Sequence, residues 1–362
     1  MSRYGVEGFS DEELEYYSRQ MVLREMGLNG QRRLKEKRAC VVGLGGLGSI
    51  ISTQIASMGI GHLRIVDRDI VEISNLQRQH LYGVDVIGLP KVEAAANRLR
   101  RLNPFIEIEP QPISLNPMTV ERILEGVDVV LDGLDRMAPR YVLNRACLKL
   151  GIPYIYGAAI TNVGNTSTII PGETACLECF QGGLDDASLP TCAVVGVNPS
   201  IVNIIASIQV SEALRILLGR RPNLANILLF CDLDSMTFER ISLMRAERCP
   251  ACGGVSPQPP QPFEEVEEIC GREGRRVFIV NPREERRLNM EKLEHVLASM
   301  GFNIYKRGEL GITFTAPKGF RGSILKSGVS ILEGIGDRDE ALRLSHKIID
   351  ENLDSIKNKH LI

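Results

Sequence analysis

Short apolar runs alternate with amphipathic stretches of helical period through the first two thirds of the chain. The apolar runs predict buried strands at residues 38–46, 62–67, 106–112, 127–135 and 152–159. The amphipathic stretches predict helices at residues 48–59, 90–102, 139–151 and 198–218. Strands that alternate with helices predict an α/β fold built on a Rossmann-like, doubly wound sheet.

Local signals place the ends of several of these helices. Ser10 followed by Glu13 is a capping box and starts a helix in SDEELEYYSRQ. Pro90 suits the start of the helix at 90–102, and Gly59 ends the helix at 48–59. Together, the predicted strands and helices form a first domain that is expected to cover residues 1–254.

The pattern changes after residue 254. The segment VSPQPPQPFEE contains four prolines among polar residues, which predicts a linker over 255–269. Beyond it, a strand, a helix, four short strands and a final helix predict a small α+β domain over 270–362.

Composition narrows the class of protein. The chain has 362 residues and a formal net charge of -2, which gives no electrostatic reason to expect nucleic acid or an anionic membrane as a partner. No unbroken apolar run is long enough to span a membrane, and the N-terminus lacks the apolar core of a secretory signal. We therefore expect a cytoplasmic protein.

Glycines follow the first predicted strand in VVGLGGLGS. Gly43, Gly45 and Gly48 form a G-x-G-x-x-G pattern with an additional Gly46, at the start of a helix whose N–H groups favour phosphate. Asp67, at the end of the next strand, has the usual position of an acid that binds a ribose hydroxyl. Taken alone, this pattern favours NAD and an NAD-dependent oxidoreductase.

Cations in the next segment favour a triphosphate instead. Arg78 and Lys91 follow strand ends, and Asp135 ends the apolar strand VDVVLDGLD. ATP needs positive charge along its phosphates and a Mg²⁺ held by a carboxylate, which these three residues would supply at one crevice. The alternative is that Arg78 and Lys91 are ordinary solvated surface residues.

Several motifs then occur in one order. They are YSRQ, VVGLGGLGS, GIGHLRIVDRDIVEISNLQRQ, PKVEAA around Lys91, LNP at 102–104 and TCAVVGV. In these motifs the chain resembles the MoeB/ThiF/HesA family, the activating enzymes of ubiquitin-like proteins and sulfur carriers. The resemblance covers residues 10 to about 254.

The resemblance implies ATP-dependent adenylation of the C-terminal glycine carboxylate of a ubiquitin-like modifier or sulfur-carrier protein that ends in Gly-Gly. It implies a homodimer in which Arg19 reaches the active site of the second subunit. It further implies that the nucleotide is bound by Gly43, Gly45, Gly46 and Gly48, and its ribose by Asp67. The phosphates would be bound by Asn75, Arg78 and Lys91, and Mg²⁺ by Asp135. Two other classes remain as alternatives, an NAD-dependent oxidoreductase and a non-catalytic scaffold of the same fold.

One position departs from the family. The family has asparagine directly after the magnesium aspartate, whereas this chain has Arg136. Arg136 either adds a phosphate contact or lies on the surface. Arg140 matches the family's arginine.

The cysteines suggest two kinds of chemistry. Cys176 and Cys179 form one C-x-x-C pair, and Cys249 and Cys252 form a second, which together predict a structural Zn²⁺ site of four thiolates. Cys192 lies ahead of a predicted helix, where a thiolate is stabilised. The family has a cysteine at this position, which implies a thioester or related covalent bond with the activated carrier, or no role at all.

The C-terminal domain lacks the cysteine loop of the rhodanese domains that many fused family members carry. Cys270 is its only cysteine and lies at its start. We expect a docking module for a ubiquitin-like protein or a conjugating enzyme, and the alternative is an appendage that stabilises the dimer.

Overall fold

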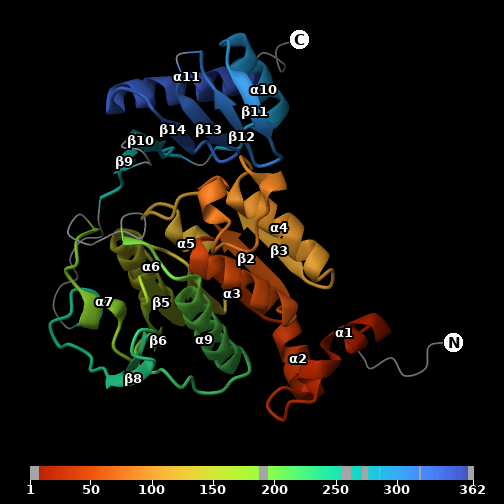
Figure 1. The fold of residues 1–362 in the computed structure, drawn as a ribbon, viewed down its shortest axis with the longest axis vertical. Helices are drawn as coiled ribbons and strands as arrows, with labels where there is room; N and C mark the ends of the chain where they lie inside the picture. Colours follow the sequence, from red (N-terminus) through yellow and green to blue (C-terminus); the bar gives the residue numbers. More distant parts are fainter. Residues whose placement is uncertain are drawn as a thin grey trace.

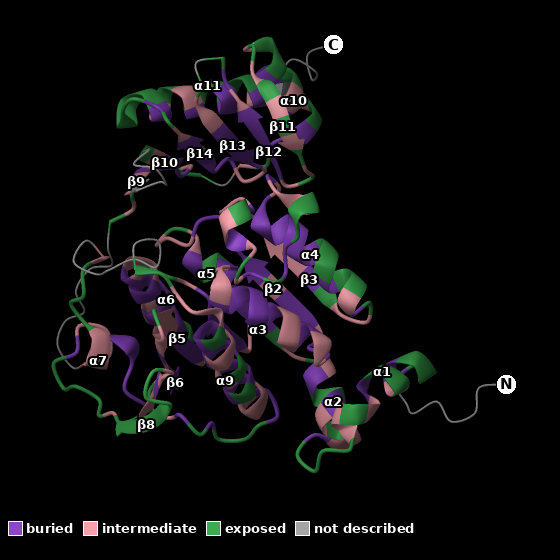
Figure 2. Cartoon of the chain, viewed as in Figure 1, coloured by how far each residue is buried: buried purple, intermediate pink, exposed green. Residues whose placement is uncertain are grey.

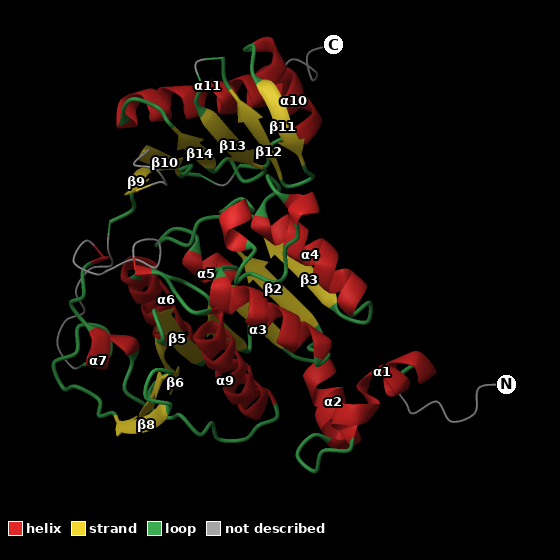
Figure 3. Cartoon of the chain, viewed as in Figure 1, coloured by secondary structure: helices red, strands yellow, loops and turns green. Residues whose placement is uncertain are grey.

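A computed structural model describes residues 8–186, 195–253, 262–270, 276–284, 286–317 and 319–357. The described chain contains two separate β-sheets, and helices pack on each of them (Figure 3). The N-terminal and C-terminal sheets have their own clusters of buried side chains (Figure 2).

The first sheet has eight strands in the order β3-β2-β1-β4-β5-β6-β7-β8. The strands from β3 to β5 pair in parallel, and β6, β7 and β8 extend the sheet by antiparallel pairing. Their bounds are β1 Arg38–Val42, β2 His62–Val66, β3 Glu107–Gln111, β4 Val129–Asp132, β5 Tyr154–Ile160, β6 Val163–Ile169, β7 Ile227–Asp232 and β8 Thr237–Ser242. The parallel part confirms the Rossmann-like doubly wound arrangement, because β1 connects to β2 on one side and β4 lies on its other side.

Helices cover both faces of this sheet (Figure 1). The cluster on one face unites α3 (Gly46–Ser57), α4 (Lys91–Leu102) and α9 (Pro199–Leu217). The cluster on the other face contains α5 (Val120–Ile123), α6 (Met137–Leu150) and the start of α7 (Leu177–Gln181). Two short 3-10 turns, η1 (Ile73–Asn75) and η2 (Val84–Val86), connect β2 to α4.

The expected helix boundaries have visible physical causes. Ser10 caps α1 (Asp11–Met21), and the Glu13 side chain accepts from the Ser10 backbone N–H, which confirms the capping box. Gly59 and Gly151 follow α3 and α6 with φ of 85° and 70°, a left-handed conformation that glycine adopts without strain. A further helix, α2 (Gly27–Lys35), packs beside α1 and was not expected from the sequence.

Helix α9 is long and apolar enough to cross a membrane by length and composition. Half of its apolar window is buried inside the protein, and its buried residues belong to the cluster that also contains α3 and β1. It is the central core helix of the first domain.

The second sheet is antiparallel, with the order β11-β12-β13-β14-β10-β9. Its strands are β9 Val266–Cys270, β10 Arg276–Val280, β11 Asn303–Arg307, β12 Gly311–Thr315, β13 Arg321–Leu325 and β14 Ser330–Glu333. Helices α10 (Met290–Ser299) and α11 (Arg338–Lys357) pack on the face turned away from the first domain (Figure 1). Strand β9 begins within the range that the sequence assigns to the linker.

Candidate functional site

The strand order predicts a ligand-binding crevice at the carboxyl ends of β1 and β4. The chain leaves β1 toward β2 on one side, and β4 lies on the other, so the two following loops diverge there. Gly43 to Gly45 follow β1, Asp67 follows β2, and Asp135 follows β4. The three segments that the sequence singled out therefore meet at one edge of the sheet.

Two glycines of the fingerprint are required by close packing. A Cβ on Gly43 would lie 2.6 Å from the Gly133 carbonyl oxygen, and a Cβ on Gly48 would lie 1.8 Å from the Gly43 carbonyl oxygen. Gly43 also has a φ of 87°. Gly45 differs, because the nearest protein atom to its added Cβ is 3.9 Å away. The turn is thus tight against the sheet and open at Gly45, where α3 begins.

Asp67 holds this turn in place. Its carboxylate accepts the backbone N–H of Leu44 at 2.6 Å and that of Asp69 at 2.6 Å. The Tyr82 hydroxyl donates to the Leu44 carbonyl oxygen at 3.0 Å from the other side. Burial raises the pKa of Asp67, although Lys91 opposes the shift. Tyr82 is a contributor that the sequence did not reveal.

Lys91 is buried at the first position of α4, and its ammonium is 2.9 Å from an Asp69 carboxylate oxygen. Burial alone lowers the pKa of Lys91, but the Asp69 and Asp67 carboxylates raise it above its usual value, and Asp135 acts in the same direction. Lys91 is therefore a charged ammonium among three carboxylates. Asp69 is the partner that sequence reasoning missed; its only signal was the DRD tripeptide.

The segment after β2 contributes further polar groups. The Arg78 Cδ is 3.9 Å from the Cβ position of Gly46, so its side chain lies over the start of α3, and its guanidinium donates to the Ser74 carbonyl oxygen. Asn75 is buried and accepts from the backbone N–H of Glu72. Among the described residues, the buried Gln79 Oε1 has no hydrogen-bond partner. Gln79 Nε2 is 3.9 Å from the Gly45 Cβ position, so this amide borders the open turn.

Asp135, Arg136 and Arg140 differ in their exposure and in their partners. The Asp135 side chain is exposed after β4, where it is accessible to a cation from solvent. Arg136 is partly exposed and lies 3.6 Å from both Asp186 and Glu267. Arg140 is buried against Asp132 at 3.0 Å and serves the core.

Arg19 lies at the other end of the first domain. Its neighbour Gln20 donates to the Met58 carbonyl oxygen, directly after α3 ends, whereas α3 begins in the glycine turn. The helix between has 12 residues and is roughly 18 Å long. Within one chain, Arg19 is thus not brought to the crevice.

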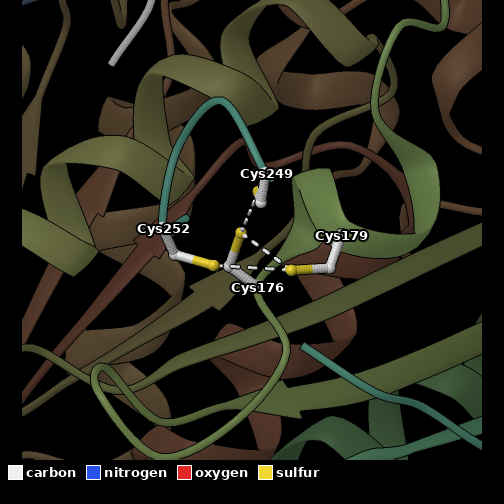
Figure 4. A group of neighbouring side chains, drawn as sticks. All are labelled: Cys176, Cys179, Cys249 and Cys252. Carbon is white, nitrogen blue, oxygen red and sulfur yellow. Dashed lines mark hydrogen bonds between the residues drawn. The ribbon is translucent and has the colours of Figure 1, made fainter. Parts of the chain in front are cut away.

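The two C-x-x-C pairs meet although they are far apart in sequence. All four sulfur atoms lie within 4.8 Å of one another, and Figure 4 shows them pointing toward a common centre. The Sγ of Cys176 is 3.8 Å from that of Cys179 and 3.5 Å from that of Cys249, and Cys179 and Cys252 are 3.4 Å apart. Four thiolates at 2.3 Å from a tetrahedral Zn²⁺ would be about 3.8 Å apart. The cluster could therefore hold a metal ion of this kind.

The surroundings of the cluster support ligation. The backbone N–H of Ala246 donates to the Cys179 sulfur at 3.4 Å, and burial raises the pKa of the Cys176 thiol. A cation at the centre would be needed to keep that sulfur ionised. Cys192 lies outside the described residues. Three other cysteines are buried core residues, namely Cys40, Cys147 and Cys231.

The crevice thus combines an open helix N-terminus, a buried ammonium, a guanidinium over the turn and an exposed carboxylate. This set can bind a polyphosphate and a divalent cation, and it can stabilise charge that develops on a phosphoryl group.

Comparison with known proteins points to one family. A family model described as the ThiF family matches residues 17–252. The SAMP-activating enzyme E1 of Haloferax volcanii is 38% identical over 67% of this chain and 89% of its own length. The molybdopterin-synthase adenylyltransferase of Escherichia coli is 37% identical over 67% of this chain and 98% of its own length. The sulfur carrier protein adenylyltransferase of Thermus thermophilus is 35% identical over 73% of this chain and 98% of its own length.

Among solved structures, E. coli MccB resembles this chain with a TM-score of 0.60 and 21% identity, over 71% of this chain and 77% of that one. This likeness concerns the fold. The matched family range ends at residue 252, before the second sheet begins.

Proposed function

The chain belongs to the ThiF family, and we propose that it uses ATP to adenylate the C-terminal glycine carboxylate of a ubiquitin-like modifier or sulfur-carrier protein. The named relatives are adenylyltransferases and an activating enzyme of such carriers. The observation that carries the proposal for this chain is the meeting of Asp67, Lys91 and Asp135 around the glycine turn. An NAD-dependent oxidoreductase would not require this set of charges.

In this proposal, each segment of the crevice has one task. The glycine turn at Gly43, Gly45, Gly46 and Gly48 would admit the nucleotide, and Asp67 would accept a ribose hydroxyl in addition to holding the turn. Arg78, Asn75 and Lys91 would hold the phosphates, and the unpartnered Gln79 amide oxygen is a further group beside the same turn. Asp135 would hold Mg²⁺, which supplies positive charge to the leaving pyrophosphate when bound.

The reaction is a nucleophilic displacement at phosphorus. A carboxylate oxygen of the carrier's terminal glycine forms a bond to the α-phosphorus of ATP, and the bond from that phosphorus to the bridging oxygen breaks. The products are an acyl-adenylate and pyrophosphate. Orientation of the two reactants and stabilisation of charge by Lys91 and Arg78 account for most of the rate enhancement in such a step.

We further propose that the enzyme is a homodimer. Arg19 lies about one helix length from its own crevice, so a role in catalysis requires that it enter the crevice of a partner subunit. A cytoplasmic location is proposed with it, and it agrees with a zinc site of free thiolates rather than disulfides.

We also propose roles for five cysteines and for the C-terminal domain. Cys176, Cys179, Cys249 and Cys252 would bind one structural Zn²⁺, and Cys192 would accept the activated carrier as a thioester or related bond. The C-terminal domain would offer a docking surface to the carrier or to a conjugating enzyme.

The proposal is tested by ATP–pyrophosphate exchange with candidate carriers ending in Gly-Gly. We expect exchange that depends on the carrier in the wild type and its loss in Asp135→Ala. Glu125→Ala, an exposed acid just before β4 and thus at the opposite edge of the sheet, is the matched control and should retain wild-type exchange. Absence of exchange with every carrier, in folded protein that binds ATP, would contradict the proposed activity.

A further inference from the structure

The C-terminal domain lies against the edge of the first sheet that carries the crevice (Figure 1). The Ser114 hydroxyl, just after β3, donates to Asn281 at 2.5 Å, and the Ser327 hydroxyl donates to the Pro112 carbonyl oxygen at 2.5 Å. The Thr313 hydroxyl donates to the Gly88 carbonyl oxygen at 2.8 Å, just before α4. These contacts lie at the carboxyl ends of the parallel strands, next to the nucleotide segments.

One acidic side chain from this domain reaches two of those segments. Glu267 on β9 accepts two hydrogen bonds from the Arg68 guanidinium, at 2.6 and 2.9 Å, and its other partner Asn281 donates at 2.8 Å. Its second oxygen is 3.6 Å from a guanidinium nitrogen of Arg136. Arg68 directly follows Asp67, and Arg136 directly follows Asp135.

The start of α4, which carries Lys91, also contacts the C-terminal domain. Glu93, two residues after Lys91, is buried in the first turn of α4. Its carboxylate accepts the backbone N–H groups of Glu309 and Leu310 at 2.9 and 2.8 Å, and the Leu310 side chain packs against the core of the first domain. The start of the helix that carries Lys91 is therefore anchored by the turn between β11 and β12.

Charge explains why this chain needs an acid at Glu267. Arg136 places a cation directly after Asp135, and Arg68 places another directly after Asp67. Uncompensated, both guanidinium groups would be free to pair with the carboxylates that the reaction requires. Glu267 offers Arg68 a hydrogen-bonded carboxylate at 2.6 Å and Arg136 an ion-pair partner at 3.6 Å.

We propose that the C-terminal domain is a positioning part of the nucleotide crevice and that Glu267 is its main positioning residue. The inference rests on the proposed function, since it concerns the same ATP site. Glu267 holds Arg68 and Arg136 away from Asp67 and Asp135, and so it fixes the loops after β2 and β4 in the arrangement that binds ATP.

The test uses the full-length chain with Glu267→Gln, which has nearly the same shape without the charge. Glu268→Gln is the matched control, because Glu268 is the next residue on β9, is half exposed and pairs with Arg276 of its own domain. Breaking one partner of a partly buried, hydrogen-bonded charge pair is costly, and we expect the KM for ATP to rise roughly tenfold in Glu267→Gln. The KM for the carrier should stay unchanged, and Glu268→Gln should match the wild type.

If Glu267 only stabilised the fold, the result would be different. In that case Glu267→Gln would lower the melting temperature, while the KM for ATP of the folded enzyme would remain that of the control; this outcome would overturn the inference. If Glu267→Gln does not fold, Glu267→Asp keeps the charge at a shorter reach and should give an intermediate KM. Adding Glu267→Gln to the double variant Arg68→Gln/Arg136→Gln should have little further effect, since both cations that Glu267 pairs with are then already absent.

Binding of Mg-ATP measured by calorimetry separates this inference from the proposed function. A wild type that binds ATP without any carrier-dependent exchange counts against adenylation. The ratio of ATP dissociation constants for Glu267→Gln and Glu268→Gln still decides the role of Glu267, and equal constants would refute it.

Discussion

Loss of one ligand from the four-cysteine cluster should lower the stability of the first domain. Cys252→Ser replaces a soft thiolate by a hydroxyl, a poor ligand for Zn²⁺. A metal ion bound by the four cysteines would close a loop from Cys179 to Cys249 of about 70 residues, and a cross-link across such a loop stabilises the folded state by about 4 kcal/mol. This is a large part of the roughly 5–15 kcal/mol that stabilises an ordinary domain.

Zinc content by mass spectrometry and unfolding by urea would measure the effect together. We expect one Zn²⁺ per wild-type chain, none in Cys252→Ser, and a free energy of unfolding lower by about 4 kcal/mol in the variant. Chelated wild type should show the same loss, and chelator should change Cys252→Ser no further. Cys231→Ser is the control for metal content, because Cys231 is buried outside the cluster and should leave the zinc in place.

Two results would refute this reasoning. Wild-type protein that is free of metal under reducing conditions, yet as stable as before chelation, would show that the four sulfurs pack without an ion. Full zinc occupancy in Cys252→Ser would show that the ion is held elsewhere.

The remaining predictions concern the crevice. A heterodimer of an Arg19→Ala subunit and an Asp135→Ala subunit should regain part of the exchange activity that each homodimer lacks, since one crevice then has both groups; no recovery would exclude action in trans. Cys192→Ser should retain carrier-dependent pyrophosphate exchange and lose any adduct that a reducing agent cleaves on a denaturing gel, and an unchanged adduct would assign it to another residue. Although burial raises the pKa of Glu267, the hydrogen-bonded Arg68 lowers it below its usual 4.5. The stability that Glu267 contributes is therefore present above about pH 4.5 and is lost as the pH falls through the lowered value. The difference in urea midpoint between wild type and Glu267→Gln should be constant near neutral pH and shrink in acid, and a difference independent of pH would contradict the ion pair.

The parallel part of the fold could be predicted because its signals are local. The glycine turn, the capping box at Ser10 and the stop at Gly59 each depend on residues within a few positions of one another. The antiparallel strands β6 and β8 were missed for a physical reason. Strand β6 buries hydroxyl side chains, with Thr166 bonded to the Tyr156 carbonyl oxygen and Thr168 to Glu212, so it lacks the apolar pattern of a buried strand. Strand β8 is exposed along its whole length and lacks a hydrophobic face.

The candidate site also has a part that the sequence predicts and a part that it does not. Asp67, Lys91 and Asp135 follow strand ends, and the rule for open α/β sheets is enough to bring them together. The contacts that hold the neighbouring loops could not be predicted, because the Arg68–Glu267 pair joins positions 199 residues apart and Ser114–Asn281 joins positions 167 apart. Only the docking of the second domain creates these pairs.

That docking changes how the role of the second domain must be tested. Deleting residues 256–362 would remove Glu267 and any docking surface together, so loss of activity would fit either role. The two proposed roles would use opposite faces, because the sheet side of the domain meets the crevice and α10 and α11 cover the other side (Figure 1). Charge changes on the outer face, such as Glu291→Lys on α10, should alter only the KM for the carrier if the domain docks it. Glu267→Gln should alter only the KM for ATP. A domain that both positions the crevice and receives the carrier would show both effects in separate variants, and this would explain why an adenylating domain whose relatives function without such an extension retains one here.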